Sequence, residues 1–169
     1  MAATFNGKVQ LGVDASLIDA IDMLTTTSPL IWNPNYVFAN GTGANQANQM
    51  FTDVRTLTAS ASEDFDLSGV LVNSLGVTLA FTAIKAFIIQ ADSTNSNDVV
   101  VGGHATAAMA SFFSASAHKV KVKPGGMVAL IAPDATGYTV TATTADLLTI
   151  TNVAGSFSAT YKIVVIGVV

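Results

Sequence analysis

The two histidines of the chain, His104 and His118, are the residues best suited to metal chemistry. A catalytic zinc site takes three protein ligands, usually with a close pair on one element, and neither histidine has a second His or a Glu two to four positions away. The chain also lacks cysteine, which excludes a thiolate nucleophile, a Cys-ligated zinc ion and a disulfide framework. The sequence therefore predicts histidines with ordinary structural hydrogen bonds, and neither a metal site nor a cofactor.

Acidic side chains gather at residues 63–66, which include Glu63, the only glutamate of the chain. Asp64 and Asp66 share one face of a strand, so they do not oppose each other across a sugar as the carboxylates of a glycosidase do. The segment 92–98 is also rich in side-chain oxygens, but it lacks the central glycine and the final glutamate of an EF-hand loop. Ordinary turns use the same residue types, which leaves calcium binding as the minor alternative at both places.

Motifs for nucleophilic catalysis and phosphate binding are missing from the sequence. No Gly-x-Ser-x-Gly elbow occurs. The segment 41–45 has two glycines of a dinucleotide-binding loop, but neither the third glycine nor a helical pattern follows it. We therefore predict that the protein is not an enzyme.

The elements that must position these side chains are strands. From residue 29 onward, about nine short apolar segments recur at spacings near ten residues, mostly separated by Gly, Pro or Asn. The clearest alternation is Lys119–Lys123, with valines predicted to face inward and lysines outward. Helical patterns are largely missing between these segments, although residues 104–117 fit either a helix or a long loop. The pattern favours an all-β fold, an antiparallel β-sandwich over residues 29–169.

The first 28 residues follow a different pattern. Leu17, Ile18, Ile21 and Leu24 have helical spacing, and Ser16 is placed to cap a helix that would begin there. The Thr-rich stretch that follows ends in Pro29, and both features disfavour continuation of a helix. The sequence thus predicts an N-terminal arm, residues 1–28, that contains one short amphipathic helix.

Composition narrows the class of protein further. Only 11% of the residues are charged, half are apolar, and the net charge is −4, a balance that excludes intrinsic disorder and gives no footprint for nucleic acid. The longest apolar run, 77–91, is too short to cross a membrane as a helix and contains Lys85. The N-terminus lacks a signal-peptide pattern, so we expect a protein that is used without export. Surplus apolar surface predicts a homo-oligomer, most simply a trimer.

Residues 122–152, followed by Tyr161-Lys-Ile-Val-Val-Ile-Gly167, resemble small β-rich virion proteins of tailed bacteriophages. The resemblance is strongest to jelly-roll capsid decoration proteins, also called cement proteins, and spans roughly residues 55–168. It implies a sandwich of the jelly-roll type, assembly in the host cytoplasm and a place on the capsid surface. The expected partners are the major capsid protein or another virion protein, and further copies of the chain.

Two groups of residues are the predicted partner contacts. One is the apolar set of the arm, and the other is the basic strand edge: Leu17, Ile18, Ile21 and Leu24, and Lys119, Lys121 and Lys123. The lysines have an alternative use, since charged side chains protect exposed strands from aggregation. An alternative function is a receptor-binding or carbohydrate-binding module, in which Trp32, Tyr36 and the loop 40–49 would form a sugar platform.

Overall fold

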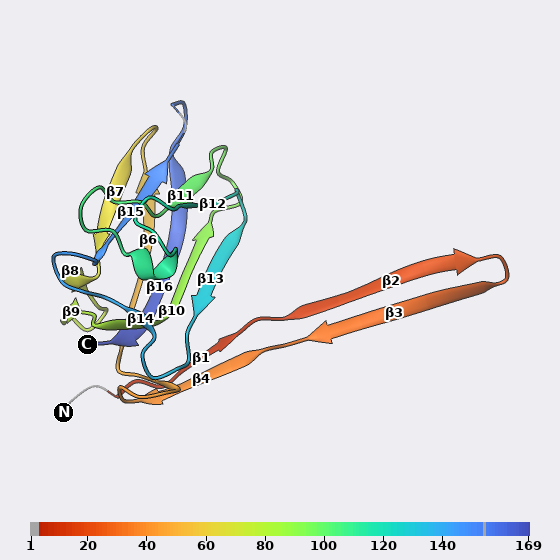
Figure 1. The fold of residues 1–169 in the computed structure, drawn as a ribbon. Coiled ribbons are helices and arrows are strands. Elements are labelled where there is room, and N and C mark those ends of the chain that lie inside the picture. Colours follow the sequence, from red (N-terminus) through yellow and green to blue (C-terminus); the bar gives the residue numbers. More distant parts are fainter. Residues whose placement is uncertain (1–3, 154) are drawn as a thin grey trace.

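The computed structural model describes residues 4–153 and 155–169, and its regular structure there consists of strands and one short 3₁₀ turn. Figure 1 shows a compact body of packed sheets from which one long hairpin projects. The predicted all-β class is thereby confirmed. The 3₁₀ turn, η1 (Ala110–Phe112), is the only helical element in the described segment 104–117, which is otherwise a loop.

Two antiparallel sheets form the body. The first has the order β13-β10-β16-β6, with a fifth strand, β14, paired to the start of β10, and the second has the order β12-β11-β15-β7. Their bounds are β6 (Gln49–Leu57), β7 (Ser62–Asp66), β10 (Ala83–Ala91), β11 (Val99–Val101), β12 (Val120–Val122), β13 (Met127–Ile131), β14 (Tyr138–Thr139), β15 (Leu147–Asn152) and β16 (Ala159–Val168).

The chain of the body is doubled back on itself. The outermost strands in the sequence pair with each other, β6 with β16, and the next pair is β7 with β15. Further inward, β10 pairs with β13 and β11 with β12. The loop 102–119 between β11 and β12 is therefore the point at which the chain turns back.

The main hydrophobic core lies between these two sheets. Alternate residues of β16 and β10 point inward, and Phe87, Tyr161 and Ile163 meet Phe65 and Ile150 of the second sheet in one cluster. Burying an aromatic or branched side chain of this size stabilises the fold by roughly 1.5–3 kcal/mol. The shared core makes the body sandwich-like, as the strand spacing predicts.

A third sheet covers part of the outer face of the first. It has the order β1-β4-β5 and is formed by β1 (Gly7–Gln10), β4 (Asn35–Asn40) and the short β5 (Gln46–Ala47). Val9, Phe38 and Ala47 pack with Ala86 of β10 and Ile166 of β16 in a second apolar cluster. This contact fixes the base of the projecting hairpin to the body.

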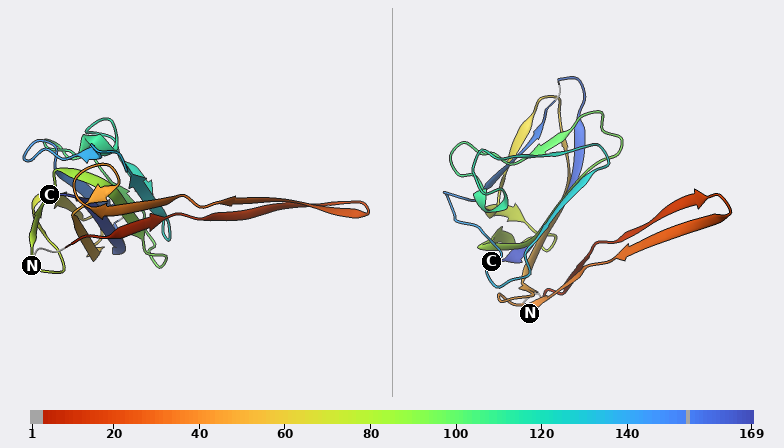
Figure 2. Two further views of the ribbon diagram at one scale, coloured as in Figure 1. Left: turned by 90° about the horizontal axis from the view of Figure 1, so that it is seen from below. Right: turned by 45° about the vertical axis from the view of Figure 1, so that its right-hand side comes forward.

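The projecting hairpin consists of β2 (Val13–Ile21) and β3 (Leu24–Trp32). Its pairing continues that of β1 with β4 in one register, from Gly7 opposite Phe38 to Ile21 opposite Leu24. All residues of both strands are exposed, and two further views show the hairpin directed away from the body (Figure 2). From here on, "the arm" means the hairpin of residues 13–32, in place of the predicted arm of residues 1–28. We call β1 together with β4 the root of the arm.

The prediction of a short helix at residues 16–24 is wrong. These residues form the end of β2, the turn and the start of β3. The same apolar residues also fit a strand, because Val13, Ala15, Leu17 and Ile21 recur at even spacing and the facing Thr25–Thr27 run is β-branched. The two-residue turn between the strands is closed by Asp22, with φ of 44°, a conformation that Asp tolerates better than most residues. As a division into domains, the boundary at residue 28 stays a prediction.

A second, smaller hairpin completes the described strands. It pairs β8 (Ser68–Val72) with β9 (Thr78–Ala80), across a turn held by Asn73, whose side-chain oxygen accepts the N–H groups of Leu75 and Val77 at 3.0 Å each. Leu71 and Leu79 are buried and join the main core. The hairpin therefore closes one end of the sandwich-like body.

Lys85 fastens the loop that supports the arm root. Its side chain is fully buried, and Nζ donates to the backbone oxygens of Asp134 at 2.5 Å and Ala135 at 2.8 Å. Burial lowers the pKa of this amine, against the opposing influence of the Asp134 carboxylate. The oxygen of the neighbouring Pro133 accepts the N–H of Asn45, in the loop that follows β4. The ammonium thus links the body to the segment beside the root.

Replacing Lys85 with Met would keep the aliphatic stem but leave both carbonyls without this donor. We expect the free energy of unfolding to fall by about 1–3 kcal/mol, measured by urea denaturation. The matched change Lys119→Met, at an exposed lysine, should shift it by no more than about 0.5 kcal/mol. Equal losses in the two variants would contradict the role given to Lys85.

Candidate protein–protein interface

The arm has two faces of different chemistry. Paired residues of a hairpin lie on the same side, and successive residues of a strand alternate between sides. The face that we call face A carries seven apolar residues among its ten: Val13, Ala15, Leu17, Ile21, Leu24, Leu30 and Trp32, beside Asp19, Thr26 and Ser28. The opposite face has more polar residues, with Ile18 and Ile31 among Asp14, Ser16, Thr25 and Thr27.

The apolar side chains of the arm are open to solvent. Leu17 is 75% exposed and Leu24 is 76% exposed, and Met23 at the tip is 92% exposed. Soluble monomers rarely keep such side chains together at the surface unless the surface binds something. An isolated two-stranded hairpin is also only marginally stable in water. Both arguments point to a partner that covers the arm.

The arm is acidic as well as apolar. It contains Asp14, Asp19 and Asp22 and no lysine or arginine, so it carries a formal charge of −3 out of the total of −4. All seven basic residues of the chain lie outside residues 13–32. A partner surface that fits the arm should therefore have both apolar side chains and positive charge.

The two predicted contact groups are not brought together. Leu17, Ile21 and Leu24 lie on face A, whereas Ile18 lies on the opposite face. Lys119, Lys121 and Lys123 flank and occupy β12, an edge strand of the second sheet, far from the arm in Figure 1. Lys123 donates to Asp98 at 3.0 Å, and Lys121 lies 3.5 Å from the same carboxylate. The hydrogen bond from Lys123 and both positive charges lower the pKa of Asp98.

The histidines hold the loop at which the chain turns back. Nδ1 of His104 accepts the N–H groups of Thr106 and Ala107 at 3.3 and 3.1 Å, so its Nε2 faces Asp64 at 3.6 Å. Nδ1 of His118 donates to the backbone oxygen of Phe113 at 2.7 Å. Within the described residues, no three His, Asp or Glu side chains are grouped closely enough to hold a metal ion.

The acidic and oxygen-rich segments have local partners. Asp64 accepts from the hydroxyl of Thr149 at 2.6 Å, and Asp66 accepts from the N–H of Ser68 at 2.8 Å. In the segment 92–98, Asp92 accepts both the N–H and the hydroxyl of Thr94, which lowers the pKa of Asp92. These bonds are typical of turns and sheet surfaces.

A more buried polar cluster joins the two sheets. The hydroxyl of Tyr161 donates to Glu63 at 2.5 Å, and Arg55 donates to Glu63 at 2.6 Å and to Asp53 at 2.9 Å. The guanidinium also lies 4.2 Å from the ring centre of Phe65. Burial, followed by the bond to Glu63, raises the pKa of Tyr161 well above its ordinary range. Sequence analysis missed this cluster, because Tyr161 lies 98 residues from Glu63 in the chain and no local pattern links the two.

The aromatic pair considered for sugar binding is divided between two environments. Trp32 ends β3 and is 57% exposed on face A, whereas Tyr36 in the root packs against the second apolar cluster. In the loop 40–49, Gln46 folds back to accept the N–H of Gly43 at 2.8 Å. Trp32 therefore belongs with the apolar surface of the arm.

Comparison of the chain with known proteins gives no family model, no curated protein and no solved structure that matches it. Among the described residues, none of the helical structure is long and apolar enough to span a bilayer. The case for a function therefore depends on the geometry of the arm and the body.

Removing the His104 side chain tests its structural role. In His104→Ala the two N–H groups of Thr106 and Ala107 lose their acceptor, and we expect the free energy of unfolding to fall by about 1 kcal/mol. His104→Asn, which keeps a side-chain acceptor, should recover part of that loss. Calorimetric unfolding measures both variants. Stoichiometric zinc in the purified protein, lost in His104→Ala, would contradict the assignment.

Proposed function

We propose that this chain is a structural assembly protein, which decorates and stabilises a tailed-phage capsid through protein–protein contacts. The observation that carries the proposal is the arm, an exposed hairpin with an apolar face and a net charge of −3. Such a hairpin gains stability only when its apolar face is covered. In the body behind it, polar groups such as Lys85 and Glu63 take part in hydrogen bonds within the fold.

Strand order supports a jelly-roll body. With the two-residue strand β14 set aside, the other eight strands of the two main sheets, numbered along the chain, lie in the orders 6-3-8-1 and 5-4-7-2. The first strand pairs with the eighth, the second with the seventh, the third with the sixth and the fourth with the fifth. Wrapping one long antiparallel ribbon around a core generates this arrangement, and jelly rolls are frequent in viral capsid proteins.

The partners in this proposal are the major capsid protein or another virion protein, together with further copies of the chain in a homotrimer. Low charge favours such contacts, because few charged groups must be desolvated when surfaces pack. The location is the outer surface of the capsid, reached by assembly in the host cytoplasm. The resemblance of residues 122–152 to decoration proteins supports this choice of assembly.

Deleting residues 13–32 would remove the arm and spare its root. The hydrogen bond from the N–H of Leu11 to the oxygen of Pro34, at 3.2 Å, holds the two chain ends together. A Gly-Ser-Gly linker between Gly12 and Asn33 closes the shorter hairpin, because Pro34 has no N–H with which to complete a two-residue turn. We expect this variant to unfold at nearly the wild-type urea concentration but to lose binding to purified capsids in co-sedimentation. Full occupancy of capsids by the deleted chain would contradict the proposal.

Point substitutions separate the two faces of the arm. Leu17→Ser combined with Leu24→Ser removes two exposed residues of face A, and we expect capsid binding to weaken by about tenfold or more. Ile18→Ser combined with Ile31→Ser is the matched control on the opposite face, where the loss should be smaller. Binding isotherms on purified capsids measure both. The reverse order of effects would show that the wrong face was assigned to the contact.

A further inference from the structure

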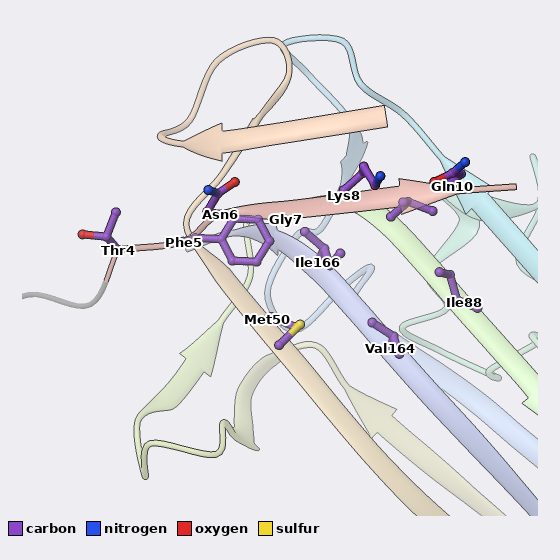
Figure 3. Close-up of a pocket in the computed structure, with 11 residues that line it drawn as sticks. Thr4, Phe5, Asn6, Gly7, Lys8, Gln10, Met50, Ile88, Val164 and Ile166 are labelled. Carbon is purple, nitrogen blue, oxygen red and sulfur yellow. The ribbon is translucent and has the colours of Figure 1, made fainter. Parts of the chain in front are cut away.

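The outer face of the first sheet carries an apolar groove beside the root of the arm. The groove has a volume of about 560 Å³, and its floor is formed by Met50, Ile88, Val164 and Ile166 from three neighbouring strands. In Figure 3, β1 crosses above these side chains and Phe5 lies at one end. Met50 is 42% exposed, so the floor is open on the side that the root leaves uncovered.

One wall of the groove is a strand edge. In the third sheet β1 is the end strand, and among the described strands it pairs only with β4. Residues 4–10, which include all of β1, line the groove. A sheet edge beside an apolar floor is the geometry that accepts an additional strand, through main-chain hydrogen bonds and side-chain burial together.

The root shows which kind of surface fits this floor. Val9, Tyr36 and Phe38 lie on the side of the root that packs toward Ile166, and the register continues without a shift into the arm. Val13, Leu17 and Leu24 therefore extend the same side of the ribbon, turned progressively by the twist of its strands. Face A of the arm thus repeats the pattern that already packs on the outer sheet face.

Charge favours the same pairing. Lys8 lines the groove, and the exposed Lys162 lies on the same outer sheet face two residues before Val164. The arm brings Asp14, Asp19 and Asp22 with no basic residue. The arm of the same chain projects away from its own body (Figures 1 and 2), so it leaves its own groove open.

We propose that the groove formed by Met50, Ile88, Val164, Ile166 and the free edge of β1 receives face A of the arm from a second copy of this chain. The inference rests on the proposed structural role and names the immediate partner of the arm. Each copy then supplies one arm and one groove, which is a heterologous contact that closes into a ring or continues along a surface lattice.

The cysteine-free chain permits a direct test by disulfide trapping between copies. Leu17→Cys places a thiol on face A, and Met50→Cys places one in the groove of a differently tagged copy. Mixed under mild oxidation, these full-length variants should form a mixed disulfide dimer at least about tenfold faster than either control mixture. The controls are Ile18→Cys with Met50→Cys, which uses the opposite face, and Leu17→Cys with Val72→Cys, which uses an exposed position on β8.

A second measurement uses the charges. Lys8→Glu should slow trapping several-fold, and combining it with Asp19→Lys on the arm-bearing copy should restore much of the rate. Arm-to-arm dimers of Leu17→Cys alone as the fastest product would overturn the proposal. A copurifying small apolar molecule that fills the groove in native mass spectrometry and blocks trapping would also overturn it.

The design separates the two proposals. If the wild-type chain coats capsids in an arm-dependent manner but Met50→Cys is never trapped by an arm, the groove inference fails and the structural role stands. If trapping occurs in solution but capsids are not bound, the structural role in the virion fails and the contact between copies stands.

Discussion

The packing of the arm root on the outer face of the first sheet is the contact on which the rest of the arrangement depends. Val9 and Phe38 cover Ala86 and Ile166. At this end, the first sheet therefore has apolar side chains packed on both of its faces, instead of one face exposed to solvent. A two-stranded ribbon has little stability by itself. Anchored in this way, it can extend for nine residues per strand beyond the body.

Polar side chains of the body also hold loops and sheets in place, as the apolar contact of the root does. Lys85 holds the loop behind the root, and His104 holds the loop where the chain turns back. Glu63 of the second sheet accepts hydrogen bonds from Tyr161 and Arg55, which lie opposite each other on adjacent strands of the first sheet. Lys85, His104 and Glu63 each have partners within the fold, which offsets the cost of removing their polar groups from water.

Sequence patterns predicted the body better than the arm. The alternation of Lys119–Lys123, for example, corresponds to β12, where Val122 is buried and the three lysines are exposed as the pattern predicts. In the arm, the spacing of Leu17, Ile18, Ile21 and Leu24 satisfied a helix as well as a strand. Pairing with the Thr-rich β3 decided between the two, and such long-range pairing is not visible in a local window. The groove was unpredictable for a related reason, since its lining comes from four separate strands.

The doubled-back path of the chain also sets the order in which the arm and the outer face of the first sheet are completed during synthesis. The arm is synthesised before β16, the strand to which Val164 and Ile166 belong. The first sheet is incomplete until β16 inserts between β10 and β6, and contacts of such long sequence separation form slowly. A nascent copy therefore has an arm before it has a finished outer sheet face. In the proposed contact between copies, a chain still being made would lack the groove, so only chains that have completed their fold would receive an arm.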